Sequence, residues 1–242
     1  MKQTIRLLKG SLTQIYRDQM LLLLCFTPFM VSILLKIAIP VINRLLTKYL
    51  NFQLTPYYLM VDALVITLNP MLISVMTGLL MLDERDDGIC QYYSVTPVGG
   101  KAYLMMRLSL PFFYSLIASL VLIPFTSLSG LSYGLMILPA AVSSYSGILM
   151  GMILVSIASN KVEGLAVSKL MGIIIFGIPL AWFANSYLRA IGILLPTYWL
   201  MDMLLQAKAR QFVRYMADFI LGVTCTTIWI IGLYRIFIKK IK

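Results

Sequence analysis

The stretch GLMILPAAVSSYSGILMGMILVSIA, residues 134–158, contains no charged side chain over 25 consecutive positions. A helix needs about 20 predominantly apolar residues to cross the hydrocarbon core of a bilayer. The apolar residues of this stretch are continuous and lack the regular polar alternation of a β-barrel strand. The stretch therefore predicts a membrane-spanning helix and disfavours a β-barrel.

Further apolar runs lie on both sides of this stretch. We predict that five of them also span the membrane: residues 20–39, 59–82, 103–126, 170–187 and 217–234. The composition agrees, because 60% of the 242 residues are hydrophobic and 12% are charged, about half the charged share of a soluble domain. A soluble enzyme and a disordered tail are excluded on this basis. The expected fold is an all-α membrane protein with six transmembrane helices.

The N-terminal segment is too polar to be a span. Apolar residues recur there at helical spacing, at Ile5, Leu8, Leu12 and Ile15. The other side is filled by Lys2, Arg6, Lys9, Thr13 and Arg17. This pattern predicts a basic amphipathic helix lying in the membrane interface. We therefore expect an interfacial helix over residues 1–19 followed by a transmembrane domain over residues 20–242. A signal peptide fits less well, because no small-residue cleavage site follows the first apolar run.

The segment before the last span, residues 188–207, is apolar but interrupted. It contains Pro196 and the charged residues Arg189 and Asp202. We predict two short helices that dip into the bilayer from the outer side and return, forming a re-entrant pair around Pro196, Tyr198 and Trp199. A hairpin that lies on the membrane surface is the alternative.

Lysine and arginine residues are divided unevenly between the two sides of the predicted spans. With the N-terminus inside, 13 of the 20 lie on the cytoplasmic side and 7 on the outer side. Because cytoplasmic loops carry the excess of basic residues, this count predicts cytoplasmic N- and C-termini. The net charge of +11 is thus interpreted as topology and contact with anionic lipid head groups, and no nucleic-acid partner is expected.

The residue types that carry out most enzyme chemistry are missing or scattered. The chain has no histidine, which excludes His-dependent nucleophilic catalysis, His-ligated zinc and His proton relays. Its three cysteines, Cys25, Cys90 and Cys225, form no C-x-x-C motif, so neither a disulfide framework nor a metal site is indicated. We therefore expect no catalytic, cofactor-binding or metal-binding residue in this chain.

The energy for any transport must come from outside this chain. No charged residue lies at the centre of a predicted span, which argues against coupling to a proton or sodium gradient. Asp62 and Asp218 lie near span ends and are interpreted as solvated anchors. The phosphate-binding motif of many ATPases is missing, since Gly99-Gly100-Lys101 lacks its first glycine and closing hydroxyl. ATP could then drive the chain only through an ATPase on another polypeptide.

Polar residues within two spans mark a candidate substrate path. Asn69 precedes Pro70 in the second span, and Ser143, Ser144 and Tyr145 lie in the fourth. Serines in spans also bond to their own backbone or to a neighbouring helix. Asn69 could equally pair with the carbonyl that Pro70 leaves free at a kink. A substrate path and ordinary helix packing therefore both remain open.

The segment between the second and third spans, ERDDGICQYYSVTPVGGKAYLMMR over residues 84–107, is the most informative about function. Its first residues are acidic, which favours the N-terminus of a short helix over residues 83–93. On that helix Ile89, Tyr92 and Tyr93 would form an apolar and aromatic patch, and the proline of Thr96-Pro97 would end it. A short cytoplasmic helix with such a patch suits insertion into the groove of a partner protein.

This segment resembles the loop between the second and third spans of ABC-2 type exporter permeases. The matching positions, in chain order, are Glu84, Gly88, Thr96-Pro97, Tyr103-Leu104 and Arg107. This chain departs from the family at Ile89-Cys90, where the family often has Thr-Leu, and at Arg107, where it often has Lys. Weaker similarities run along the rest of the chain, at Arg17-Asp18, Pro28, residues 160–164, Lys169-Leu170 and residues 195–199.

The resemblance implies a coupling helix that contacts an ATPase subunit. Its residues here would be Glu84, Asp86, Asp87, Gly88, Ile89, Tyr92, Tyr93, Thr96 and Pro97. Glu84 would cap this helix or meet a basic residue of the ATPase. The resemblance also implies that residues around Pro196, Tyr198 and Trp199 form the outer re-entrant element.

The sequence is thus identified as the permease subunit of an ABC exporter in the bacterial plasma membrane. Its expected partners are an ABC ATPase subunit, which would bind ATP and Mg, a second permease copy or paralogue, and the lipid bilayer. Its substrate is expected to be amphipathic: a drug, an antimicrobial peptide or a lipid-linked molecule. A membrane assembly factor without transport activity and a secondary transporter are the two rival interpretations.

Overall fold

The computed structural model describes residues 19–88, 99–183 and 185–241, and these ranges are helical apart from their connecting turns. The interfacial helix predicted over residues 1–19 lies outside them, except for Gln19, which is the first residue of the first described helix. The described residues include six helical stretches that are long and apolar enough to cross a membrane. The prediction of an all-α membrane protein with six spans is confirmed.

The helices run further than the apolar segments alone indicate. In chain order the helices are α2 (Gln19–Leu50), η1 (Thr55–Tyr57), α3 (Tyr58–Asp86), α5 (Gly99–Thr126), α6 (Tyr133–Ile157), α7 (Lys161–Leu170), α8 (Gly172–Ile175), α9 (Gly177–Phe183), α10 (Ser186–Gly192), α11 (Pro196–Lys208) and α12 (Phe212–Ile241). The fifth span consists of three short pieces, α7 to α9, within Lys161–Phe183. Helices α2 and α3 continue beyond their apolar runs, to Leu50 and to Asp86.

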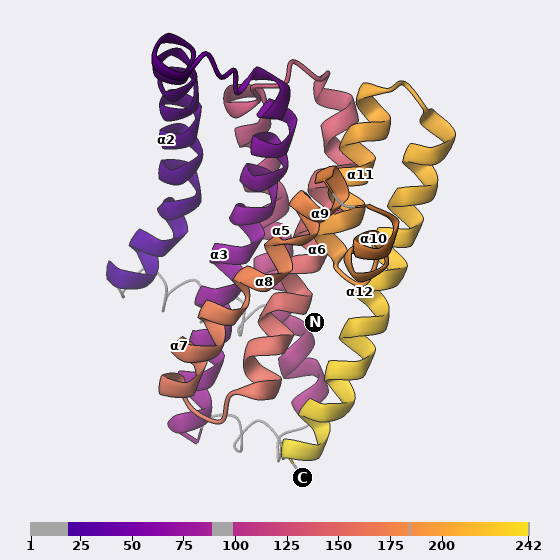
Figure 1. The fold of residues 1–242 in the computed structure, drawn as a ribbon. Helices are drawn as coiled ribbons and strands as arrows, with labels where there is room; N and C mark the ends of the chain where they lie inside the picture. The colour runs from indigo at the N-terminus through magenta and orange to yellow at the C-terminus, as the bar shows by residue number, and fades with distance from the viewer. Residues whose placement is uncertain (1–18, 89–98, 184, 242) are drawn as a thin grey trace.

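Helices α3 and α6 form the centre of the bundle (Figure 1). The most apolar windows of α3 and α6 are 67% and 72% buried, whereas that of α2 is 6% buried. Helix α6 packs against α3, α5, α11 and α12, and α2 stands at the edge beside α3 and α5. The apolar surface of α2 is thus left for lipid or for another chain.

The two ends of the bundle carry different connections. One end holds the start of α3, the turn over residues 127–132 and the turn between α11 and α12 (Figure 1, top). The other end holds the last turn of α3, the connection between α6 and α7 and the end of α12 (Figure 1, bottom). They are termed the Asp62 end and the Asp83 end after a residue of α3 found at each.

Helices α10 and α11 form a hairpin that folds back against α9 and α12. The Thr197 hydroxyl donates a hydrogen bond to the carbonyl of Ile174. The turn of the hairpin lies beside the middle of α12, because the indole of Trp229 donates to the carbonyl of Leu194 over 2.9 Å. The indole of Trp199 donates to the carbonyl of Ile193 over 3.0 Å. These donors satisfy carbonyls that could find no water inside a bilayer. The depth of the hairpin in the membrane stays a prediction.

Candidate functional site

The acidic residues that follow the second apolar run belong to α3. The helix continues through Asp83, Glu84 and Arg85 to Asp86, and Asp87 is its C-cap. The prediction that acids begin a new helix at residue 83 is therefore wrong. Acids are disfavoured at a helix C-terminus by the dipole alone, but here their side chains find cations and amide donors on other helices. The four residues Asp83–Asp86 are termed the hub.

The side chains of the hub point in different directions because of the rotation between successive residues of an α-helix. Consecutive residues of an α-helix are turned by about 100°, so Glu84 and Arg85 face different neighbours. Residues three apart lie on the same face, so Asp83 and Asp86 point to one neighbour. The hub therefore contacts several helices within a single helical turn.

Glu84 faces α5 inside the chain. The Tyr103 hydroxyl donates to its carboxylate, and Arg107 forms an ion pair with it. The side chains of Glu84 and Arg107 are only 4% and 11% exposed. Glu84 therefore does not cap a coupling helix, and its carboxylate is already engaged within the chain. This corrects the expectation that it meets a basic residue of a partner.

The side chain of Arg85 caps the C-terminal end of α6. Its guanidinium donates to the carbonyls of Val155 and Ala158, each over 3.0 Å. It also lies over the ring of Phe237 in α12, with 5.7 Å between the guanidinium carbon and the ring centroid. The last carbonyls of a helix have no partners within it, and a cation there is favoured by the helix dipole.

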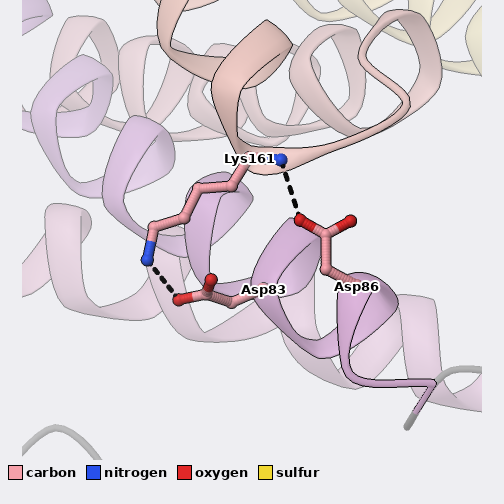
Figure 2. Close-up of polar contacts among 3 residues, drawn as sticks. All are labelled: Asp83, Asp86 and Lys161. Carbon is pink, nitrogen blue, oxygen red and sulfur yellow. Dashed lines mark hydrogen bonds and ion pairs between the residues drawn. The ribbon is translucent and has the colours of Figure 1, made fainter.

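Asp83 and Asp86 hold the start of α7 (Figure 2). The ammonium of Lys161 donates to Asp83 over 2.5 Å, and the backbone N–H of Lys161 donates to Asp86 over 3.1 Å. Asn160 caps the same helix by accepting from the N–H of Glu163 over 2.8 Å. The carboxylate of Glu163 in turn accepts from the N–H of Ser159, which completes a reciprocal cap.

The charges of this site balance. The three acids of the hub are matched by Arg85, Arg107 and Lys161, so the cluster is formally neutral. It joins the end of α3 to the start of α5, the end of α6 and the start of α7. Arg107 and Lys161 were not assigned to a site from the sequence. The available signal was the presence of basic residues near the ends of the neighbouring spans, Arg107 in the third and Lys161 before the fifth.

Beyond the hub, the chain leaves the helix at Gly88. The N–H groups of Asp87 and Gly88 donate to the carbonyls of Asp83 and Arg85. Gly88 has a φ of 74°, which suits a glycine after a helix C-cap. Among the described residues, a Cβ at Gly88 would meet nothing within 4 Å, so the glycine is required there by backbone conformation. The remaining predicted coupling residues, Ile89, Tyr92, Tyr93, Thr96 and Pro97, lie outside the described residues.

The residues of the candidate substrate path lie between helices of this chain. Asn69, Ser143 and Ser144 are 1% exposed or less. Ser143 donates over 3.0 Å to the carbonyl of Ile66. That carbonyl lacks a helix donor because the residue four positions on is Pro70. Ser143, and not Asn69, therefore pairs with the carbonyl that the proline leaves free.

The other polar contacts of this region also join helices. The amide oxygen of Asn69 accepts from Ser32 of α2, and its nitrogen donates to Ser119 of α5. The hydroxyls of Tyr145 and Thr227 lie 3.0 Å apart across α6 and α12. These contacts support the interpretation as helix packing that the sequence left open.

Two acids near span ends are buried, so their interpretation as solvated anchors is wrong. Asp62 is 3% exposed and accepts three hydrogen bonds: from the Ser127 hydroxyl, the Leu128 N–H and the Ser129 N–H. Asp218 is 7% exposed, and its Oδ2 has no hydrogen-bond partner among the described residues. Within the same ranges, no group of three or more His, Cys, Asp or Glu residues could hold a metal ion.

Comparisons with known proteins agree with this architecture. A family model described as fluoroquinolones export permease protein Rv2686c-like matches residues 11–234. Two curated relatives carry the name fluoroquinolones export permease protein and come from Mycobacterium tuberculosis, strains CDC 1551 / Oshkosh and ATCC 25618 / H37Rv. Each is 27% identical over 190 residues, which cover 76% of this chain and 74% of the relative. No solved structure matches this chain.

Proposed function

Because the chain belongs to the Rv2686c-like family of fluoroquinolones export permease proteins, we propose that it is the transmembrane subunit of an ATP-driven exporter. It is a multi-pass plasma membrane protein of the export permease type. The observation that carries the proposal is the family match, which takes in almost all of the six spans. The ATPase would be a separate chain, and ATP and Mg would bind there.

The proposed substrate is an amphipathic drug, of which a fluoroquinolone is the first candidate. The relatives are named for the export of these compounds. A groove of about 460 Å³ between α5, α6 and α12 supports a ligand of this kind, because it is lined mainly by apolar residues, with the polar residues Ser109 and Tyr234 among them. Ligand sites of drug size are mostly apolar with a few polar groups.

The proposed contact with the ATPase begins where the hub ends. Asp86 and Asp87 are exposed there, and the residues from Gly88 to Pro97 would form the surface that meets the ATPase. ATP-driven closure of the ATPase would displace this loop. The hub supports the proposal because it joins the base of the loop to three other helices, so that a displacement would move several spans together.

A second permease subunit is part of the same proposal. Two permeases, alike or different, would face each other across the path of the substrate. The apolar and largely exposed surface of α2 supports a position beside lipid or a second subunit. With the hub facing the ATPase, the Asp83 end would be cytoplasmic, in agreement with the predicted topology.

The test is transport by the complex isolated from native membranes. The tagged chain is purified with its bound partners, which are identified by mass spectrometry, and the complex is reconstituted into liposomes. We expect ATP-dependent movement of a fluorescent fluoroquinolone that stops when the ATPase partner carries an inactivating substitution. The isolated chain should not turn over ATP.

Three results would overturn the proposal. Movement that requires an ion gradient and not ATP would identify a secondary transporter. Saturable ATP hydrolysis by the isolated chain would contradict a separate ATPase. A complex that contains no ATPase and moves no drug would favour a membrane assembly factor.

A further inference from the structure

The contact between the hub and Lys161 differs in character from the other contacts of the hub. Glu84 and Arg107 are almost completely buried, whereas the side chains of Lys161 and Asp83 are 48% and 44% exposed. Separating a buried ion pair leaves uncompensated charges and is strongly unfavourable. An exposed pair contributes about 0–1 kcal/mol and can open at little cost. Within the described residues, the Lys161 contact is thus the ion pair of the hub that can be released and remade.

This contact also involves the backbone at the start of α7. Lys161 is the first residue of the helix, so its backbone N–H has no acceptor within the helix. Asp86 supplies that acceptor while Asp83 holds the side chain of the same residue (Figure 2). Two carboxylates on one face of α3 therefore contact the first residue of α7 at two points, its backbone and its side chain.

Next to this contact, α7 and α3 pack with little space between them. A Cβ at Gly164 of α7 would lie 2.4 Å from a methyl carbon of Leu82 in α3. Any other residue at this position would require the Leu82 side chain to move. With the ion pair closed, the start of α7 therefore packs directly against the end of α3.

Helix α7 leads directly to the hairpin. The fifth span is interrupted after Leu170 and after Ile175, where α7 and α8 end. Ile174 accepts the hydrogen bond of Thr197 in α11, and a Cβ at Gly177 would lie 2.5 Å from the backbone nitrogen of Tyr198. A displacement of the start of α7 would therefore reach the hairpin through a short and closely packed segment.

We propose that Asp83, Asp86 and Lys161 form a releasable clamp through which the hub positions the fifth span and its hairpin during ATP-driven transport. This inference rests on the proposed function. In it, Lys161 is a positioning residue that contacts neither substrate nor ATP. The closed clamp transmits the movement of the loop after the hub to α7. With the clamp open, ATP is still hydrolysed, but fewer substrate molecules are moved for each ATP.

The experiment compares charge variants in the reconstituted complex. We measure drug transported per ATP hydrolysed, basal ATPase activity and thermal stability. Lys161→Glu places a third acid beside Asp83 and Asp86, and we expect the transport ratio to fall by about 5-fold. Basal ATPase activity and the melting temperature should change little, because the contact is exposed. The reciprocal exchange Asp83→Lys with Lys161→Asp should bring the ratio back to within about 2-fold of the unmodified protein.

Lys169 provides the matched control. It is an exposed lysine of the same helix, and no ion pair involves it among the described residues. Lys169→Glu makes the same change of charge without touching the clamp and should leave the ratio unchanged. If Lys161→Glu fails to assemble, Lys161→Gln removes the ion pair without repulsion and should lower the ratio by a smaller factor.

The outcomes separate the clamp from the proposed function. An unmodified complex that moves no drug with ATP contradicts the proposed function and the clamp together. If the unmodified complex transports and the Lys161 variants keep its ratio, the clamp alone is wrong. The clamp is equally wrong if Lys169→Glu lowers the ratio as much as Lys161→Glu, or if the exchanged pair fails to recover it.

Discussion

The two ends of α3 are both held by acids, but in opposite ways. At one end Asp62 accepts three hydrogen bonds from a single turn, residues 127–129. At the other end the hub, Asp83–Asp86, contacts α5, α6 and α7 through different side chains. The Asp62 contact can only fasten one connection, whereas the hub links the positions of several spans. The Asp62 end thus fastens one connection, whereas the Asp83 end joins several helices, which is the arrangement that the proposed transmission of movement requires.

The largest expected effect concerns the buried pair of the hub. Glu84→Gln leaves Arg107 charged and buried without its carboxylate, so we expect a loss of about 3–5 kcal/mol in the free energy of unfolding. Equilibrium unfolding in mixed detergent micelles measures it. The double variant Glu84→Gln with Arg107→Met is the control and should recover much of the loss. A loss below about 1 kcal/mol for Glu84→Gln would show that the pair is not buried as described.

The second prediction applies the same test to the other end. Asp62→Ala leaves two N–H groups and one hydroxyl of the 127–129 turn without an acceptor, and we expect a loss of about 2–3 kcal/mol. Unfolding in micelles again measures it. Asp218→Asn is the matched control, because it alters a buried acid of which one oxygen has no partner among the described residues. That substitution should be neutral or stabilising. Equal losses for the two variants would contradict the anchoring role of Asp62.

The third prediction concerns Arg85. Arg85→Met keeps much of the side-chain volume but leaves the carbonyls of Val155 and Ala158 without their donor, and we expect a loss of about 1–2 kcal/mol. Amide hydrogen exchange should become faster at the end of α6 and stay unchanged at its start. Faster exchange at the start of α6 instead would contradict the assignment of Arg85 to this helix end.

The smallest expected effect compares one glycine at each end. Gly88 has a φ of 74° and Gly130 a φ of 71°, and among the described residues a Cβ at either would meet nothing within 4 Å. Alanine at each position should therefore cost a similar amount, about 1 kcal/mol, through backbone strain alone. If Gly88 also faces the ATPase, Gly88→Val should reduce transport per ATP in the reconstituted complex while Gly130→Val does not. If both valine variants transport the same amount of drug per ATP, Gly88 serves only the backbone conformation and does not contact the ATPase.

The spans and the break before the last of them were predictable because both are local properties. A run of apolar residues such as 134–158 must be buried in protein or lipid wherever it lies. Pro196 begins a helix because a proline lacks only a donor that the first turn would not use. Where an apolar run is followed by charged residues, as at Asp83, the local sequence did not show where the helix ends. The hub looked like the start of a helix, yet helical hydrogen bonding continues to Asp86.

The sequence singled out the segment that begins at Glu84, but the contacts that Glu84 makes differ from the expected ones. Glu84 was expected to act outside the chain, and its partner Arg107 was noted only as part of a resemblance. Ser143 was expected beside a substrate path, and it satisfies the carbonyl of Ile66 instead. Such partners cannot be read from spacing, because each pair joins separate helices whose relative rotation depends on the packing of the whole bundle.

The sequence by itself determined that this chain crosses a membrane through helices. Hydrophobic length is sufficient for that conclusion. Only the tertiary structure decided which charges meet. Lys161 and Asp83 are 78 residues apart, and both would be ordinary charges at span ends if α3 and α7 did not pack together. The partners and the burial of a charge at a helix end depend on which helix packs beside it, as the different contacts of Asp62, Glu84 and Asp83 show.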